Sequence, residues 1–159
     1  FIMKNSKKIL LILLIVFVVA QFFGPEKNEG STESLTAFFE DTKPPEIVKA
    51  ILTESCFDCH SNTTRYPWYN NITPVNYWMA EHVKHGTKHF NVSNWDNNSI
   101  KRKDHKIEEL IEMVEDKEMP LASYTWTNTE ANLTDAQIQD ILNWAKQVRT
   151  VYALAPRPE

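Results

Sequence analysis

Cys56-Phe57-Asp58-Cys59-His60 is the stretch that decides the fold of this 159-residue chain. Two thiols three residues apart lie on one turn of helix, where each can add to one vinyl group at the edge of a porphyrin. The histidine that follows then lies beneath the iron, with one ring nitrogen as a ligand and the other available to a backbone carbonyl. The pattern is therefore typical of c-type haem attachment, with Cys56 and Cys59 as the attachment residues and His60 as the proximal ligand.

Three other sites use the same two cysteines. A thioredoxin-type redox pair follows a strand in a βαβ unit, and no strand-helix-strand pattern surrounds Cys56. A zinc site needs two further ligands, for which His82, His85 and His89 are available. A structural disulfide is the third alternative. The pattern favours haem over these three.

The composition fits one domain with a single modest core. Both cysteines of the chain belong to the one motif, so no disulfide framework remains, whereas five Trp, eight Phe and five Tyr provide flat apolar rings that suit a porphyrin. Of the 17 Lys and Arg, three precede Ile9, so 14 remain against 21 Asp and Glu beyond Pro25, which gives a net charge of about −7. This balance argues against nucleic acid as a partner and suits a basic docking face on a redox protein.

The first 25 residues are predicted to be a signal or anchor segment. Lys4, Lys7 and Lys8 precede an apolar run from Ile9 to Phe23. These 15 residues are fewer than the roughly 20 that usually span a bilayer, and we favour an uncleaved anchor over cleavage after Ala20. Because lysines favour the cytoplasmic side, the rest of the chain is expected to face the periplasm from the inner membrane.

Beyond this segment the sequence predicts an all-α domain with long loops. Residues 26–34 are polar and indicate a tether, and residues 35–155 are expected to form the haem-binding domain. Apolar residues at helical spacing predict helices over 45–56, 74–86, 103–119 and from Thr134 onward. Thr134 is expected to cap the last helix.

The sixth iron ligand decides the function, because a strong protein ligand makes an electron carrier and an open position admits a small molecule. Met119 is the candidate, since Pro120 stops a helix there and leaves the chain extended. There are two alternatives to Met119: His82, on an apolar helix face, and an open or water-bound sixth position. Met79 and Met113 fall at helical positions that favour core packing.

Several strings carry a family resemblance that covers nearly the whole chain. They are Cys56-Phe57-Asp58-Cys59-His60-Ser61-Asn62, Arg65-Tyr66-Pro67-Trp68-Tyr69, Ile72-x-Pro74-Val75, Phe90-Asn91-x-Ser93-x-Trp95 and Glu118-Met119-Pro120-Leu121-x-Ser123-Tyr124. With them the chain resembles the cytochrome c-like haem-binding domain proteins, small exported proteins with an N-terminal anchor and one c-type haem. The resemblance implies covalent haem on Cys56 and Cys59 and ligation by His60. By similarity to class I cytochromes c, it also supports Met119 as the distal ligand and Trp144 as an aromatic near the haem.

We therefore expect single-electron transfer by one covalent haem c outside the cytoplasmic membrane, by an electron carrier rather than an enzyme. Tyr66, Trp68, Trp78 and Trp144 are expected to keep water from the haem. The expected partners are redox proteins. Two alternatives stay open: a haem-bearing accessory subunit of a membrane respiratory complex, and a haem-based sensor of small ligands.

Overall fold

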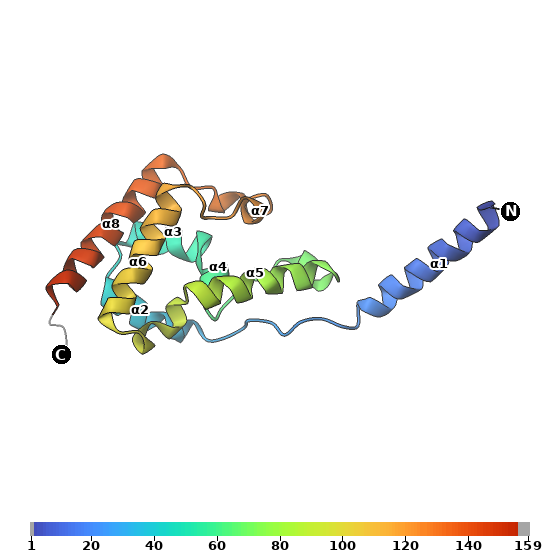
Figure 1. Ribbon diagram of the computed structural model, residues 1–159, viewed down its shortest axis with the longest axis horizontal. Helices are drawn as coiled ribbons and strands as arrows, with labels where there is room; N and C mark the ends of the chain where they lie inside the picture. Colours follow the sequence, from blue (N-terminus) through green and yellow to red (C-terminus); the bar gives the residue numbers. More distant parts are fainter. Residues whose placement is uncertain (1, 156–159) are drawn as a thin grey trace.

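The computed structural model describes residues 2–155, and side chains from residue 5 onward. Within this range the chain is helical and contains no strand, apart from an isolated bridge between Glu29 and Thr63 (Figure 1). The predicted all-α class is therefore confirmed. In chain order the elements are α1 (Ile2–Ala20), η1 (Thr32–Leu35), α2 (Thr36–Thr42), α3 (Glu46–Ser55), α4 (Phe57–His60), η2 (Trp68–Asn71), α5 (Val75–His89), η3 (Val92–Asn97), α6 (Ile100–Glu115), α7 (Ala122–Thr125), η4 (Thr129–Ala131) and α8 (Asp135–Leu154), where η denotes a 3₁₀ helix.

The four predicted helices correspond to α3, α5, α6 and α8. Thr134 caps α8 as expected, because its hydroxyl accepts a hydrogen bond from the Gln137 N–H while the Gln137 side chain accepts one from the Thr134 N–H. The helix α6 begins three residues earlier than predicted, since the Ser99 hydroxyl caps it. It also ends earlier, at Glu115, because Lys117 adopts a left-handed conformation (φ 57°) that closes the helix.

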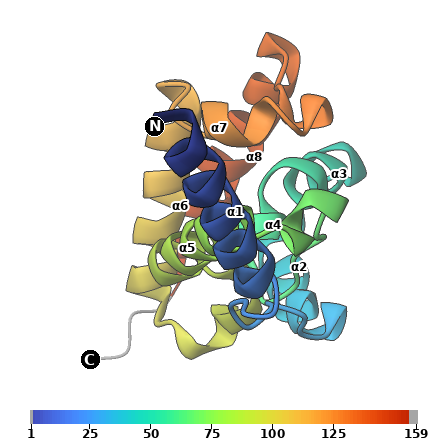
Figure 2. The ribbon, with the colours of Figure 1, turned by 90° about the vertical axis from the view of Figure 1, so that its right-hand side faces the viewer.

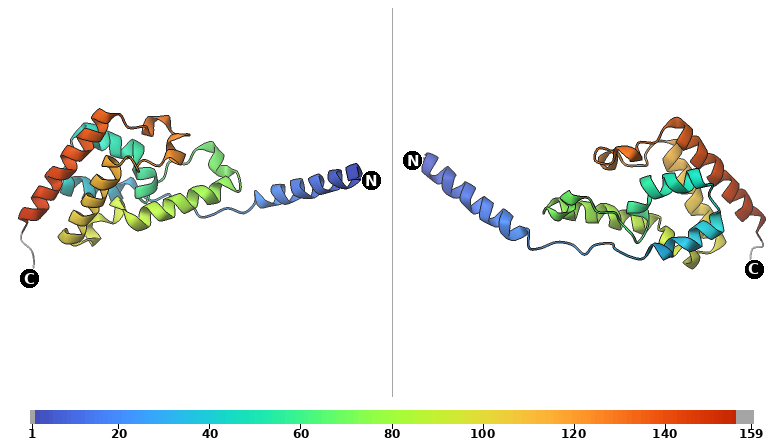
Figure 3. Two further views of the ribbon diagram at one scale, coloured as in Figure 1. Left: turned by 45° about the horizontal axis from the view of Figure 1, so that its top comes forward. Right: turned by 180° about the vertical axis from the view of Figure 1, so that it is seen from behind.

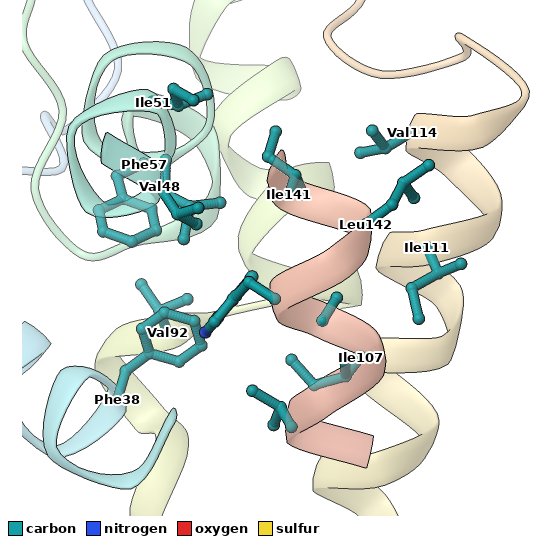
Figure 4. Close-up of a cluster of buried hydrophobic side chains, with 14 of the residues drawn as sticks. Phe38, Val48, Ile51, Phe57, Val92, Ile107, Ile111, Val114, Ile141 and Leu142 are labelled. Atoms are coloured by element: carbon teal, nitrogen blue, oxygen red, sulfur yellow. The ribbon is translucent and has the colours of Figure 1, made fainter. Parts of the chain in front are cut away.

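The scaffold is a pair of long helices, α6 and α8, against which α2, α3 and η3 pack (Figure 4). Their buried side chains form one core, in which Phe38, Trp95 and Trp144 meet edge to face. Core residues from α6 and α8 include Ile107, Ile111, Val114, Ile141 and Leu142. Removal of this apolar surface from water is the main source of stability.

A second feature of the scaffold is a carboxylate on α2 that joins three other elements. Asp41 accepts hydrogen bonds from the Trp95 indole at 2.7 Å, the Tyr152 hydroxyl at 2.6 Å and the Lys103 ammonium at 3.1 Å. These four residues are called the Asp41 cluster. They tie α2 to η3, α6 and α8.

The helix α1 extends away from the domain in Figure 3, and it lies in front of the domain in Figure 2, which views the molecule from that end. Its apolar side chains from Ile9 to Val19 are exposed. Among the described residues, no helix is long and apolar enough to cross a membrane.

The predicted tether, residues 26–34, lies against the domain and is partly structured. The Gly30 N–H donates to the Asn62 carbonyl at 2.7 Å, the Thr64 N–H donates to the Asn28 carbonyl at 2.9 Å, and η1 begins within the segment at Thr32. Ordered contacts with the loop after His60 thus begin before the predicted domain boundary at residue 35.

Candidate haem site

The motif forms its own short helix, α4, immediately after α3. Cys56 leaves the α-region (φ −122°, ψ −41°) and separates the two helices. Phe57 is buried and meets the Phe38 ring at 6.0 Å between centroids, so one of the two residues between the cysteines anchors α4 in the core. The thiols of Cys56 and Cys59 are free and lie on one turn, as haem attachment requires.

The electrostatic surroundings of the thiols argue against a reactive redox pair. Burial raises the pKa of Cys56 to about 12, with a further contribution from Cys59. Burial and the nearby charge of Asp58 raise the pKa of Cys59 to about 11. A nucleophilic cysteine needs a lowered pKa, so neither thiol has the environment of a thioredoxin-type site.

His60 is held in the orientation that an iron ligand needs. Its Nδ1 atom lies 3.1 Å from the Gly86 carbonyl oxygen and 2.9 Å from the Phe90 carbonyl oxygen. Because carbonyl oxygens only accept, Nδ1 carries the proton, and the lone pair of Nε2 stays available to a metal. Burial lowers the pKa of His60 against the opposing effect of the two carbonyls, which favours the neutral imidazole that ligates iron.

Gly86 allows this arrangement because α4 and α5 touch at its Cα atom. A Cβ atom at position 86 would collide with the carbonyl group of Cys59 and would lie 3.0 Å from the Cys59 Cβ. Only glycine fits between the two backbones, and its own carbonyl then reaches His60. The sequence marks Gly86 as a helix end, whereas α5 continues through it to His89.

A cleft that is open to solvent lies beside Cys59. Residues of α5 and α7 are among those that line it. The surface exposed in the cleft is predominantly apolar and Cys59 is among its lining residues, so the residues present fit a covalently held porphyrin. The lining residues are Asp58, Cys59, Thr64, Arg65, Pro67, Tyr69, Trp78, Met79, His82, Val83, Leu121, Ser123, Tyr124, Thr127 and Asn128.

Asp58, the second residue between the cysteines, is only 6% exposed and forms a network that sequence reasoning missed. Its carboxylate accepts from the Arg65 backbone N–H at 3.0 Å, the Arg65 guanidinium at 3.1 Å and the Tyr124 hydroxyl at 2.6 Å. These three residues are called the Asp58 cluster. The available signal was that Arg65 is the only charged residue between Ser61 and Tyr69.

The Asp58 cluster also stabilises the charge states of its members. Hydrogen bonding to Asp58 raises the pKa of Arg65 despite partial burial. Burial, and then the hydrogen bond to Asp58, raise the pKa of Tyr124. At neutral pH the cluster therefore contains a protonated tyrosine and a charged arginine.

The candidates for the sixth ligand lie in different places. Met119 lies in the turn between α6 and α7, where its N–H donates to the Met113 carbonyl at 3.0 Å. Met79 and His82 lie on α5 and line the cleft. Met119 is not among the described residues that line it. The assignment of Met119 as the distal ligand stays a prediction.

The four predicted aromatics do not share one environment. Trp78 lines the cleft and packs against His82 at 4.6 Å between ring centroids. Trp68 is 76% exposed beside Tyr69, which lines the cleft. Tyr66 accepts a hydrogen bond from the Asn28 N–H of the tether, and Trp144 is a core residue whose indole donates to the Thr42 carbonyl. Their contact with haem stays a prediction, and of the four only Trp78 is among the described residues that line the cleft.

The zinc alternative has no support in the part of the chain that the structure describes. No group of three or more His, Cys, Asp or Glu side chains there is placed to hold a metal ion. Instead, His85 contacts Glu81 and His82 contacts the Trp78 carbonyl on their own helix.

Comparison with known proteins gives one match. A family model described as a haem-binding domain matches residues 15–147, which is most of the chain. The chain therefore belongs to this haem-binding domain family. No curated protein and no solved structure matches it significantly.

Proposed function

We propose that this member of the haem-binding domain family carries one haem c, attached through Cys56 and Cys59, and transfers single electrons outside the cytoplasm. The observation that carries the proposal is the pairing of two free thiols on one helical turn with a neutral His60 whose Nδ1 is held by two carbonyls. When bound, the haem supplies a one-electron couple between Fe(III) and Fe(II).

The protein residues have distinct tasks in this proposal. His60 would provide its Nε2 lone pair to the iron, and the Gly86 and Phe90 carbonyls keep the ring from rotating. The side chains of α5 that line the cleft exclude water, which favours a stable electron carrier. Met119 is the proposed sixth ligand, because a thioether raises the reduction potential relative to a second histidine.

Export and partners belong to the same proposal. The lysines before the apolar run of α1 match a secretory signal, and its exposed apolar side chains favour contact with lipid over water. The domain would then act at the inner membrane on its periplasmic side, with redox proteins or a respiratory complex as partners. Replacing both Leu13 and Val16 by Lys is expected to keep the protein in the cytoplasm without attached haem. Haem attachment in that variant would contradict the proposed export.

The haem-based sensor is the second candidate. It is favoured by one observation: Met119 is not among the described residues that line the cleft. A sixth position without a strong protein ligand would admit carbon monoxide in the reduced state.

The deciding experiment compares the purified wild type with Met119→Ala, Met79→Ala and His82→Ala. Haem that stays with the chain after denaturation would establish covalent attachment, and release of the haem would overturn it. In the wild type we expect a low-spin spectrum with the weak long-wavelength band of sulfur ligation and no carbon monoxide binding. Only Met119→Ala should lose the band and bind the gas. Loss in Met79→Ala or His82→Ala instead would move the ligand to α5, and gas binding by the wild type would favour the sensor.

A further inference from the structure

Asp58 lies between the two attachment cysteines and faces the cleft. Its neighbour Phe57 lies in the core, so the two residues between the cysteines serve opposite sides of α4. A buried carboxylate is costly unless donors compensate its charge. The donors come from two segments outside α4. Arg65 belongs to the 61–69 loop, and Tyr124 belongs to residues 121–128, here called the α7 segment.

The α7 segment forms one wall of the cleft but has little packing to hold it there. None of the four described residues of α7 is buried, and Trp126 is 82% exposed. Among hydrogen bonds in the described part of the chain, those that join this segment to α3 or α4 both start at the Tyr124 hydroxyl. It donates to Asp58 at 2.6 Å and contacts the Glu54 carbonyl oxygen at 3.3 Å. One hydroxyl group therefore provides the hydrogen-bond link between this wall and the haem motif.

The 61–69 loop is fixed at the same carboxylate. Both the backbone N–H and the guanidinium of Arg65 donate to Asp58, and the guanidinium also donates to the Glu54 carbonyl at 2.8 Å. The Thr64 hydroxyl donates to the Asp58 carbonyl at 2.6 Å. Charge-assisted hydrogen bonds of this kind are the strong ones, and several on one group fix its geometry.

We propose that Asp58 is a positioning residue of the haem site, which holds the 61–69 loop through Arg65 and the α7 segment through Tyr124 as the two fixed walls of the cleft. The inference rests on the proposed function for what the cleft contains. Met119 comes two residues before the α7 segment, so the contact between Asp58 and Tyr124 also limits how far Met119 can move from α4. Loss of that contact frees the wall and weakens the sixth position.

The test is amide hydrogen exchange, read by peptide, on the haem-loaded full chain and its Tyr124→Phe variant. This substitution keeps the ring and the Asp58 pair with Arg65 and removes only the hydroxyl. A hydrogen bond to a charged group that holds a segment closed limits its opening, so we expect exchange in peptides covering 119–128 to rise at least about tenfold. Peptides from α6 and α8 should exchange as in the wild type. Carbon monoxide binding by the reduced variant should rise with the exchange.

Tyr152→Phe is the matched control, because it removes a hydroxyl that also donates to a carboxylate at 2.6 Å, in the Asp41 cluster. It should leave exchange in 119–128 unchanged. Unchanged exchange at 119–128 in Tyr124→Phe would overturn the positioning role. Asp58→Asn should repeat the effect, and if it does not fold, Tyr124→Phe alone decides. Gas binding by the wild type would contradict the proposed electron carrier, whereas the exchange comparison would still decide the role of Asp58.

Discussion

Asp41 and Asp58 each accept a tyrosine hydroxyl at 2.6 Å and a cation at 3.1 Å, yet their partners lie in very different surroundings. Around Asp41, Trp95 and Tyr152 are themselves part of the core, so the carboxylate adds to packing that already fixes the helices. Around Asp58, Arg65 and Tyr124 belong to segments that contribute little to the core. The same kind of cluster, a carboxylate with a tyrosine and a cation, therefore strengthens an already packed scaffold around Asp41 and takes the place of packing around Asp58. Losses in the Asp41 cluster should lower stability, and losses in the Asp58 cluster should disturb the haem site.

The largest effect is expected from Trp95→Ala. This side chain is 1% exposed, meets the Phe38 ring at 4.9 Å and donates to Asp41, so its truncation leaves a cavity and removes one of the three donors to that carboxylate. Chemical denaturation should show a loss of about 3–5 kcal/mol in the free energy of unfolding. Trp126→Ala, at an exposed position of the α7 segment, should change it by no more than about 0.5 kcal/mol. A similar loss in both variants would mean that the α7 segment is as tightly packed as the scaffold.

Gly86→Ala tests the contact between α4 and α5, where the haem motif meets the rest of the domain. The added Cβ collides with the Cys59 carbonyl group, so the two helices must move apart. Overpacking of this kind costs about 1–3 kcal/mol, and the displaced Gly86 carbonyl should also alter the visible spectrum through His60. Lys84→Ala, on the exposed side of the same helix, is the control and should change neither. A stable Gly86→Ala protein with an unchanged spectrum would show that the contact can relax.

The paired variants Tyr152→Phe and Tyr124→Phe compare the two clusters directly. Each loses one hydrogen bond to a charged group, which is worth about 1.5–3 kcal/mol where the group is well buried. We expect Tyr152→Phe to lower the free energy of unfolding by about 1–2 kcal/mol with an unchanged haem spectrum. Tyr124→Phe should cost less in global unfolding and should change the spectrum. The reverse pattern, from denaturation and absorption measured on both, would contradict the division between scaffold and site.

This division also explains which features the sequence could predict. The helices α3, α5, α6 and α8 each present an apolar stripe over ten or more residues, and that periodicity does not depend on the rest of the fold. The helix α2 was missed because its seven residues are too few to show a period. The haem motif could be identified because its chemistry requires five adjacent residues.

The rest of the site depends on contacts between segments distant in sequence. Asp58 and Tyr124 are 66 positions apart, and the carbonyl of Phe90 reaches His60 across 30. No periodicity encodes such pairs, so neither the Asp58 cluster nor the partners of His60 could be derived from the chain alone. The roles of Tyr66 and Trp144 at the haem stay predictions, and the fold adds contacts that the sequence did not indicate: Tyr66 accepts a hydrogen bond from the tether, and Trp144 donates to the Thr42 carbonyl in the core.

The smallest expected effect is on the pH dependence of the free energy of unfolding in acid. It distinguishes the Asp41 cluster from a surface ion pair. Burial alone would raise the pKa of Asp41, but hydrogen bonds from Tyr152, Trp95 and Lys103 outweigh it, and the pKa lies below its ordinary value. A carboxyl whose pKa is lower in the folded protein adds stability above its unfolded pKa of about 3.9, and this stability is lost as the pH falls through the folded pKa. The difference in unfolding free energy between wild type and Asp41→Asn should therefore be constant near neutral pH and shrink below about pH 4.

Asp135 provides the comparison, since its hydrogen bond to Lys117 also lowers its pKa but the carboxyl is fully exposed. Salt screens exposed pairs more strongly than partly buried ones. In 1 M salt the acid-dependent difference should thus persist for Asp41→Asn and disappear for Asp135→Asn. If 1 M salt removed the acid-dependent difference in both variants, the donors around Asp41 would act only as nearby charges. Persistence would show that the hydrogen bonds of Tyr152 and Trp95 hold the carboxylate in the scaffold, as those of Arg65 and Tyr124 hold Asp58 at the cleft.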